Sequence, residues 1–166
     1  KIIFASTISV YGEKMNQDIY HEESAKEPFS PYAVTKLEAE EFLLKNYETQ
    51  SWILRLSPVY APDFQLNIKR RTRIFSSFYR VGDGKKKLSL CNLENIGLVI
   101  QGILEGEISA GIYNISDETK YSYNDLLNYM NAKWVLPVPF LLVKGLYCLG
   151  RLVGNIFLKE NAIKLI

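Results

Sequence analysis

Three short apolar segments, separated by longer segments of helical pattern, constrain the fold of this 166-residue chain more than any other feature. Residues 1–6, 51–56 and 111–115 are rich in Ile, Leu and aromatic residues, which is typical of strands buried on both faces of a parallel sheet. Residues 31–47 and 93–105 carry apolar side chains at helical spacing. Strands that alternate with helices in this way predict an α/β fold with a parallel sheet.

The other segments carry weaker signals. Two closely spaced prolines predict a rigid turn over residues 57–62, and Ser122 is a suitable cap for a helix over residues 123–131. The expected elements of the intervening region are a helix over 74–80, a turn over 81–84 and a strand over 87–91.

Residues 135–158 are strongly apolar, but Lys144 and Arg151 interrupt the run, and Pro137 and Pro139 stand near its beginning. The uninterrupted apolar stretch is far shorter than the roughly 20 residues of a membrane-spanning helix. We therefore expect a buried or groove-forming helix in this region and no membrane span.

The composition excludes several classes of site and partner. A net charge of +2 is too small to indicate nucleic acid or a membrane surface as a partner. His21 is the only histidine, Cys91 and Cys148 lack the spacing of metal ligands, and no G-x-S-x-G motif is present. We therefore expect no metal site and no serine-hydrolase relay, and the composition favours a reducing, cytoplasmic setting.

Tyr32 and Lys36 lie four residues apart at the start of a predicted helix. Ser30 is a natural N-cap and Pro31 suits the first helical position, so the two side chains are expected on one helix face. A nearby ammonium stabilises a phenolate where water is partly excluded, and the tyrosine can then exchange a proton with an alcohol or a ketone. The same spacing occurs in surface helices in which the aromatic ring packs and the lysine is solvated. The surrounding residues decide between these two interpretations.

Hydroxyl side chains gather at the end of the first predicted strand. Thr7, Ser9 and Tyr11 follow this strand, and open α/β sheets bind ligands at the carboxyl ends of their strands. We therefore expect a ligand near this segment, with Ser9 and Tyr11 as candidate substrate-binding residues.

Residues 67–73 form a basic cluster that contains Lys69, Arg70, Arg71 and Arg73. Such a cluster is most often a solvated helix face. It is also suited to binding the phosphates of an anionic ligand, and Arg70 and Arg71 are the candidates for that role.

Five groups of residues together carry a family resemblance over nearly the whole chain. The groups are Ser6-Thr7 with Val10-Tyr11-Gly12, Pro28 to Tyr32 with Lys36, Glu38 and Glu40, Arg55 with Val59, Tyr60 and Pro62, Gly82-Asp83-Gly84, and Gly111 to Ile115. With these five groups in this order along the chain, the sequence resembles the C-terminal portion of an extended short-chain dehydrogenase/reductase. This group contains the NAD-dependent epimerases and dehydratases of nucleotide-sugars.

The resemblance implies roles for individual residues. Tyr32 matches the catalytic acid/base, and Lys36 matches the residue that binds the nicotinamide ribose and stabilises the tyrosine anion. Thr7 matches the hydroxyl residue that hydrogen-bonds the reacting oxygen, which a threonine can do as donor and acceptor. Pro58 and Val59 match the segment near the nicotinamide carboxamide. The implied cofactor is NAD or NADP, and the implied partner is a small-molecule substrate such as a nucleotide-sugar.

The chain departs from the family pattern in three places. It lacks a G-x-G-x-x-G motif, so we expect this chain alone to bind a dinucleotide poorly and to be inactive. Pro58 replaces the usual asparagine and offers no amide to a substrate phosphate. Residues 88–95 replace an Arg-Asp pair and a His-Val-x-Asp segment that the sugar epimerases often carry.

The expected fold is therefore an incomplete Rossmann-type parallel sheet, its C-terminal half, plus a small C-terminal substrate-binding region. Residues 1–62 are expected to form the first part, and residues 63–166 mostly the second, with strands that return to the main sheet. The chain is expected to be the C-terminal part of a longer protein. A homodimer through the helix of residues 32–47 is a further expectation, with Leu37, Phe42 and Leu44 as contacts or as core residues.

Two other functions remain open beside a nucleotide-sugar epimerase or dehydratase. One is an NAD(P)-dependent reductase of an apolar hydroxy-ketone, such as a steroid- or flavonoid-like alcohol, which the apolar segment 135–158 and the missing sugar-binding groups favour. The other is a non-catalytic domain that kept the fold.

Overall fold

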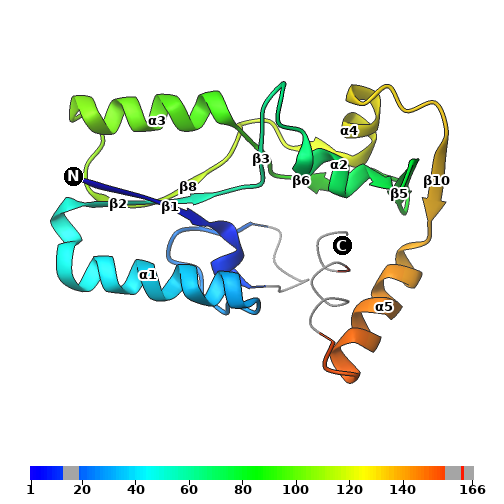
Figure 1. Ribbon diagram of the computed structural model, residues 1–166, viewed down its shortest axis with the longest axis horizontal. Coiled ribbons are helices and arrows are strands. Elements are labelled where there is room, and N and C mark those ends of the chain that lie inside the picture. The colour runs from blue at the N-terminus through cyan, green and yellow to red at the C-terminus, as the bar shows by residue number, and fades with distance from the viewer. Residues whose placement is uncertain (13–18, 156–161, 163–166) are drawn as a thin grey trace. The chain divides into compact units, whose positions relative to one another are not determined.

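The computed structural model describes residues 1–12, 19–155 and 162, and the chain divides into two compact units (Figure 1). Unit 1 consists of Lys1–Ala61 and Leu90–Glu118, and unit 2 consists of Pro62–Ser89 and Thr119–Ile166. Each unit has its own three-stranded sheet.

The sheet of unit 1 is parallel and has the strand order β1-β2-β8. β1 (Ile2–Thr7) pairs with β2 (Ser51–Leu56), which pairs in turn with β8 (Gly111–Ile115). The connection from β1 to β2 contains α1 (Pro31–Tyr47), and α3 (Leu93–Glu105) precedes β8. The two helices lie on opposite sides of the sheet (Figure 1). The predicted α/β class with a parallel sheet is confirmed.

β2 is the central strand of this sheet, and five of its six residues are buried. Its successive side chains point to opposite faces of the sheet. Trp52 and Leu54 form a core cluster with Ile103 of α3. Arg55, on the other face, hydrogen-bonds Glu40 of α1. A buried charged residue therefore lies next to the carboxyl end of the central strand.

The ends of the long helices in unit 1 follow local sequence signals. Ser30 caps α1 by accepting a hydrogen bond from the Ala33 amide, with Pro31 in the first turn, as predicted. α3 has its predicted bounds and ends at Gly106, which adopts a left-handed φ of 88°. Two short 3-10 helices complete the helical elements of unit 1, η1 (Ile8–Tyr11) and η2 (Glu48–Gln50).

The exposed face of α1 is the surface through which a homodimer was expected to form. Phe42 is 59% exposed there, whereas Leu37 and Leu44 are half-buried. The dimer stays a prediction, and Phe42 is the residue of the three that is open to a contact.

Unit 2 is built from shorter elements around a sheet of order β10-β5-β4. Its main elements are α2 (Leu66–Thr72), β4 (Arg73–Ile74), β5 (Ser77–Val81), α4 (Tyr123–Tyr129), β10 (Val135–Val138) and α5 (Phe140–Leu152). Tyr79 and Val81 of β5 pack against Val143 of α5 and Ala162, and these residues form the core cluster of the unit.

The helix predicted over residues 74–80 is wrong, because this segment is a hairpin of β4 and β5. Ile74 pairs with Ser77, and the connecting residue Phe75 has a left-handed φ of 54°. In β5 the buried residues are Tyr79 and Val81, which alternate with less buried neighbours. This spacing of two is the pattern of a strand with one buried face.

The strand predicted over residues 87–91 divides into two short strands in different units. β6 (Lys87–Leu88) pairs with β9 (Tyr121–Ser122) in unit 2, and β7 (Cys91–Asn92) pairs with β3 (Val59–Tyr60) in unit 1. The chain crosses between the units at Leu90, so one continuous strand cannot form. The turn predicted before this segment is confirmed, because the Gly84 amide donates to the Val81 carbonyl over 3.2 Å.

The apolar segment 135–158 is only partly the expected helix. Its first residues form β10, α5 begins after Pro139, and residues 156–158 lie outside the described part of the chain. Only Val143 and Gly150 of α5 are buried, so the described helix is not a core helix. Among the described residues, no helix is long and apolar enough to cross a membrane.

The start of α4 provides a first testable prediction, on the pH dependence of stability. The Asp125 carboxylate accepts hydrogen bonds from the hydroxyl and the amide of Ser122, each over 2.7 Å, and these bonds lower the pKa of Asp125. A lowered pKa in the folded state stabilises the protein above the unfolded-state pKa of about 4, and this stabilisation disappears as the pH falls through the folded-state pKa. We expect Asp125→Asn to lower the urea midpoint at pH 7, with a deficit that shrinks below about pH 4.

Asp63→Asn is the matched control, because Asp63 is an exposed aspartate in the same unit. Its urea midpoint should follow that of the unchanged chain at every pH. A deficit of Asp125→Asn that is constant with pH would contradict the role of the ionised carboxylate.

Candidate functional site

Thr7 ends β1 at the carboxyl edge of the unit 1 sheet. Its hydroxyl oxygen accepts a hydrogen bond from the Ser9 amide and lies 3.2 Å from the Ser9 hydroxyl. Thr7 thereby caps the 3-10 helix η1, which turns the chain away from the sheet. Thr7 is 9% exposed and Ser9 is exposed, so the end of β1 presents hydroxyl groups where ligands of α/β sheets bind.

Gly12 closes η1 in a conformation that only glycine tolerates well. Its φ is 77°, and a Cβ atom at this position would stand 2.0 Å from the carbonyl oxygen of Glu27. The glycine of the Val10-Tyr11-Gly12 group therefore permits a close approach between η1 and the loop before α1.

Tyr32 and Lys36 lie on one face of the first turns of α1, as predicted. The Lys36 Nζ lies 5.9 Å from the centre of the Tyr32 ring and 4.7 Å from that of Phe4. It also donates a hydrogen bond to the Ala5 carbonyl over 2.7 Å. Lys36 therefore links the tyrosine-bearing helix to β1, two residues before Thr7.

The Tyr32 side chain is 58% exposed, and its hydroxyl makes no hydrogen bond among the residues that the structure describes. Tyr32 and Lys36 are therefore brought together, whereas no hydrogen bond joins Tyr32 to Thr7 in the same described part. An exposed phenol beside an ammonium is accessible to a substrate and can exchange a proton with it.

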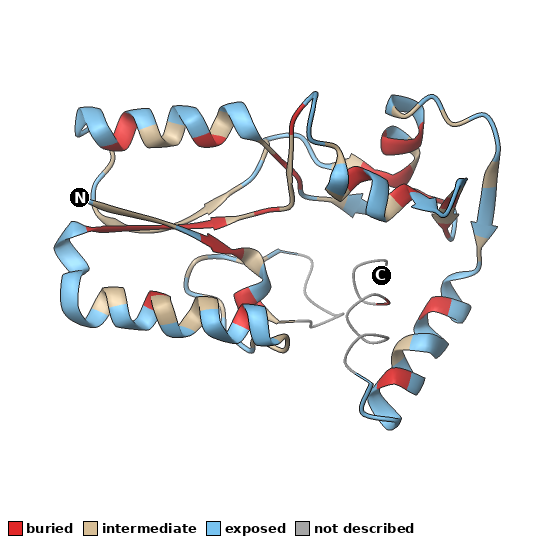
Figure 2. Cartoon of the chain, viewed as in Figure 1, coloured by how far each residue is buried: buried red, intermediate tan, exposed pale blue. Residues whose placement is uncertain are grey.

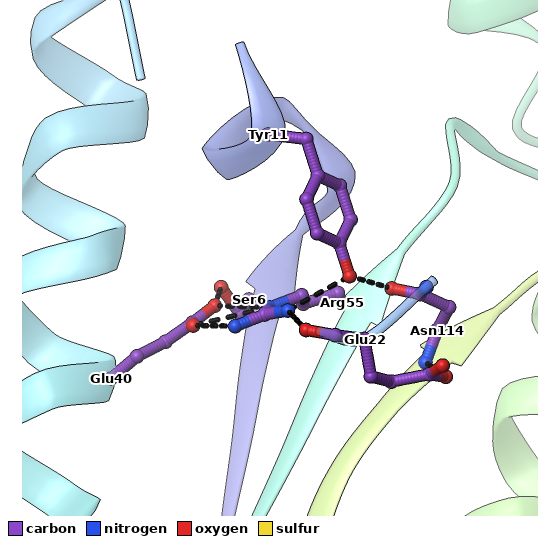
Figure 3. A network of polar contacts seen from close by, with 6 residues as sticks. All are labelled: Ser6, Tyr11, Glu22, Glu40, Arg55 and Asn114. Carbon is purple, nitrogen blue, oxygen red and sulfur yellow. Dashed lines mark hydrogen bonds and ion pairs between the residues drawn. The ribbon is translucent and has the colours of Figure 1, made fainter. Parts of the chain in front are cut away.

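A buried polar network lies next to these residues in unit 1 (Figure 3). Arg55 is fully buried, and its Nη2 lies 2.7 Å from the Glu40 carboxylate, which is 1% exposed. Its Nε also donates to both Glu40 oxygens, and Ser6 donates to the same carboxylate. The ion pair thus joins α1, one turn after Lys36, to β2, and the Ser6 hydrogen bond joins the same carboxylate to β1.

The other end of the Arg55 guanidinium holds a second group of residues. Its Nη1 donates to the Tyr11 hydroxyl over 2.8 Å and to the Glu22 carbonyl over 2.9 Å. The Tyr11 hydroxyl in turn donates to Asn114 of β8 over 2.6 Å (Figure 3). Burial disfavours the charged guanidinium, but the hydrogen bonds to Glu40 and Tyr11 outweigh it and raise the pKa of Arg55.

Tyr11 is therefore an interior residue of this network. It is 1% exposed and stacks on Tyr20, with the ring centres 5.1 Å apart. Its prediction as a substrate-binding residue stays a prediction, as does that of Ser9. No role was predicted for Arg55 or Glu40, although a charged residue within an apolar strand is a signal of a buried ion pair.

The segment after β2 is fixed by backbone and side-chain bonds. The Pro58 carbonyl accepts from the Cys91 amide over 3.1 Å, and Val59 and Tyr60 form β3. Asp117 then accepts hydrogen bonds from the Tyr60 hydroxyl, the Asn92 amide and the Asn95 side chain. Pro58 and Val59 are half-buried, and their role in cofactor binding stays a prediction.

The basic cluster lies in unit 2, on α2 and the start of β4. Lys69, Arg70 and Arg73 are exposed and line one open depression together with Phe75 and Ser76. Arg71 is not part of it. Burial lowers the pKa of Arg71, whose Nη1 donates to the Asn67 carbonyl over 3.0 Å. Of the two predicted phosphate-binding residues, Arg70 is therefore the more accessible one.

Known proteins relate to this chain through both sequence and structure. The family model of the NAD dependent epimerase/dehydratase family matches residues 1–96. No curated protein matches the sequence.

The chain is similar to several solved structures. One is the UDP-glucuronic acid 4-epimerase of Bacillus cereus in complex with NAD, with a TM-score of 0.65 and 26% identity over 82% of this chain and 49% of that one. Another is the dTDP-glucose 4,6-dehydratase of Bacillus anthracis in complex with NAD, with a TM-score of 0.62 and 20% identity over 84% of this chain and 49% of that one. A third is the UDP-N-acetylglucosamine 4-epimerase of Methanobrevibacter ruminantium, with a TM-score of 0.58 and 22% identity over 81% of this chain and 48% of that one.

The chain spans about half the length of these structures. Their shared fold confirms the Rossmann-type class of the sheet that ends in Thr7 and is packed by the helix of Tyr32 and Lys36. The family match includes this sheet's first two strands and α1, and it extends over more than half of the chain. The chain therefore belongs to the NAD-dependent epimerase/dehydratase family.

Proposed function

We propose that the whole protein is an NAD-dependent epimerase or dehydratase of a nucleotide-sugar. The observation that carries this proposal is the Tyr32–Lys36 pair, which the bond from Lys36 to the Ala5 carbonyl fixes near the carboxyl end of β1. The similarity to a UDP-glucuronic acid 4-epimerase, at 26% identity, supports the choice of substrate class.

In this proposal Tyr32 is the acid/base of the reaction. Its phenol is exposed, so a sugar hydroxyl can reach it, and the Lys36 ammonium lies 5.9 Å from the centre of its ring. The phenolate removes the proton from the sugar hydroxyl as a carbonyl forms, and it returns that proton when the carbonyl is reduced. Thr7 donates a hydrogen bond to the same oxygen and thereby orients it.

The donor groups of the chain fit a dinucleotide at this edge of the sheet. The Lys36 ammonium has three N–H donors, of which the Ala5 carbonyl accepts one, and the remaining two suit the hydroxyls of a ribose. Pro58 and Val59 lie in a segment fixed by β3 and are proposed to adjoin the nicotinamide. NAD, when bound, supplies hydride acceptance and donation. The glycine-rich turn that binds its phosphates is proposed to lie outside these 166 residues.

A nucleotide-sugar is negatively charged, and we propose that the basic cluster of residues 67–73 binds its phosphates. Arg70 is exposed on α2, and a guanidinium can bind a diphosphate through two parallel hydrogen bonds. Lys69 and Arg73 line the same depression and add positive charge to it.

A substrate comparison on the complete polypeptide with NAD tests this function. UDP-glucuronic acid, UDP-N-acetylglucosamine and dTDP-glucose are the first probes, with product formation followed by anion-exchange chromatography. We expect conversion of at least one nucleotide-sugar and no NADH- or NADPH-dependent reduction of steroid or flavonoid ketones. Reduction of the apolar ketones alone would establish the reductase in its place, and turnover of neither class would favour a non-catalytic domain.

A further inference from the structure

The two units carry opposite net charges, which the net charge of the whole chain conceals. In the sequence, unit 2 has fourteen Lys or Arg residues and four Asp or Glu residues, a net charge of +10. Unit 1 has six Lys or Arg residues and fourteen Asp or Glu residues, a net charge of −8. A net charge of +10 gives unit 2 an electrostatic preference for anionic ligands and surfaces.

The helix α5 of unit 2 is apolar on two opposite sides. One side packs into the unit through Val143 and Tyr147, which contact the cluster of Tyr79 and Val81. The other side is exposed, as the largely pale blue helix in Figure 2 shows. Its large exposed apolar side chains are Leu141, Leu142, Leu146, Leu149 and Leu152, followed by Val153 directly after the helix, with exposed fractions of 80, 54, 42, 49, 84 and 69%.

These outward side chains form one continuous face. At about 100° per residue, the positions from Leu141 to Val153 that point away from Val143 cover an arc of roughly 160° with no charged residue. Lys144 and Arg151 lie seven residues apart, and therefore next to each other, at one border of this arc. Their long side chains can place the charge at a polar boundary while the stems cover apolar surface.

An apolar face bordered by lysine and arginine is the pattern of a helix that lies in a membrane interface. The helix has 13 residues, too few to span a bilayer. We propose that α5 docks unit 2 on an anionic membrane surface, with its outer leucines among the acyl chains and Lys144 and Arg151 at the lipid headgroups. The net charge of +10 favours anionic lipid and opposes pairing with the same surface of a second copy.

Vesicle sedimentation of the purified chain tests the proposal. We expect the chain to sediment with vesicles of phosphatidylcholine and phosphatidylglycerol, and to bind at least about tenfold more weakly to phosphatidylcholine alone or in about 1 M salt. Leu141→Gln/Leu152→Gln, at the two most exposed leucines of the face, should reduce binding to the anionic vesicles by at least about tenfold.

Leu98→Gln/Leu104→Gln is the matched control. These leucines are 66% and 63% exposed on α3 of unit 1, so the same chemical change is made on a helix of the acidic unit. The control should bind vesicles as the unchanged chain does, and circular dichroism should show the same helix content in both double variants.

Three results would overturn the proposal. The first is the absence of binding to anionic vesicles. The second is binding that the α5 leucine variant leaves unchanged, because adsorption by charge alone does not need the apolar face. The third is sedimentation equilibrium in which the leucine variant converts a dimer into a monomer, which would assign the face to a second copy.

Discussion

Replacing Arg55 by methionine is expected to lower the free energy of unfolding by about 3–5 kcal/mol. The substitution leaves the Glu40 carboxylate buried at 1% exposure without its cation, and it removes the donor to the Tyr11 hydroxyl and the Glu22 carbonyl. Because folded domains are stable by only about 5–15 kcal/mol, the loss is a large share of the total. Urea unfolding followed by circular dichroism measures it.

The double variant Arg55→Met/Glu40→Met separates the cost of an orphaned charge from the cost of lost packing. We expect it to recover much of the lost stability, because replacing both members of a buried ion pair by apolar residues is often close to neutral. Lys85→Met is the control, since Lys85 pairs with Asp83 over 3.9 Å at the surface and should change the midpoint little. A double variant as unstable as Arg55→Met would mean that the remaining hydrogen bonds of Arg55, and not its charge balance with Glu40, hold this region.

In the complete polypeptide, Tyr32→Phe is expected to lower the turnover of a nucleotide-sugar by about 10²–10⁴-fold. The change removes only the hydroxyl that is proposed to exchange the proton. That side chain is 58% exposed, and its hydroxyl makes no hydrogen bond within the described part of the chain, so the urea midpoint should not change. The measurement is the steady-state rate at saturating NAD and substrate.

Tyr47→Phe is the matched control, because Tyr47 is 43% exposed at the other end of the same helix. Its turnover should equal that of the unchanged enzyme. An unimpaired Tyr32→Phe enzyme would refute the proposed acid/base, and an equal loss in both variants would show that the effect is not specific to Tyr32.

The elements that could be predicted from sequence are those determined by neighbouring residues. The start of α1 follows from Ser30 and Pro31, and the bounds of α3 follow from its apolar spacing. β5 was missed because one of its two partners is set by tertiary structure: besides its hairpin partner β4, it pairs with β10, more than fifty residues later. A short segment with mixed apolar spacing fits either a helix or a strand until that partner is known.

The candidate site likewise contains one part that neighbouring residues predict and one part that they do not. The contact between Tyr32 and Lys36 spans one helical turn, so the spacing alone predicted it. The Arg55 network joins β1, α1, β8 and the loop at Glu22, and no local pattern connects these four segments. The opposite charges of the two units were also hidden, because a net charge of +2 is a sum that carries no information on position.

The three crossings of the chain between units 1 and 2 limit how this protein can be dissected. A gene truncated after residue 61 would encode β1, α1 and β2 but neither α3 nor β8, so Trp52 and Leu54 would lose the partner that Ile103 provides. A gene that starts at residue 62 would likewise retain α3 and β8 without the strand on which β8 pairs. Each unit is therefore built from two separate segments of the sequence. To produce one unit alone, its two segments must be joined by a new linker or by circular permutation.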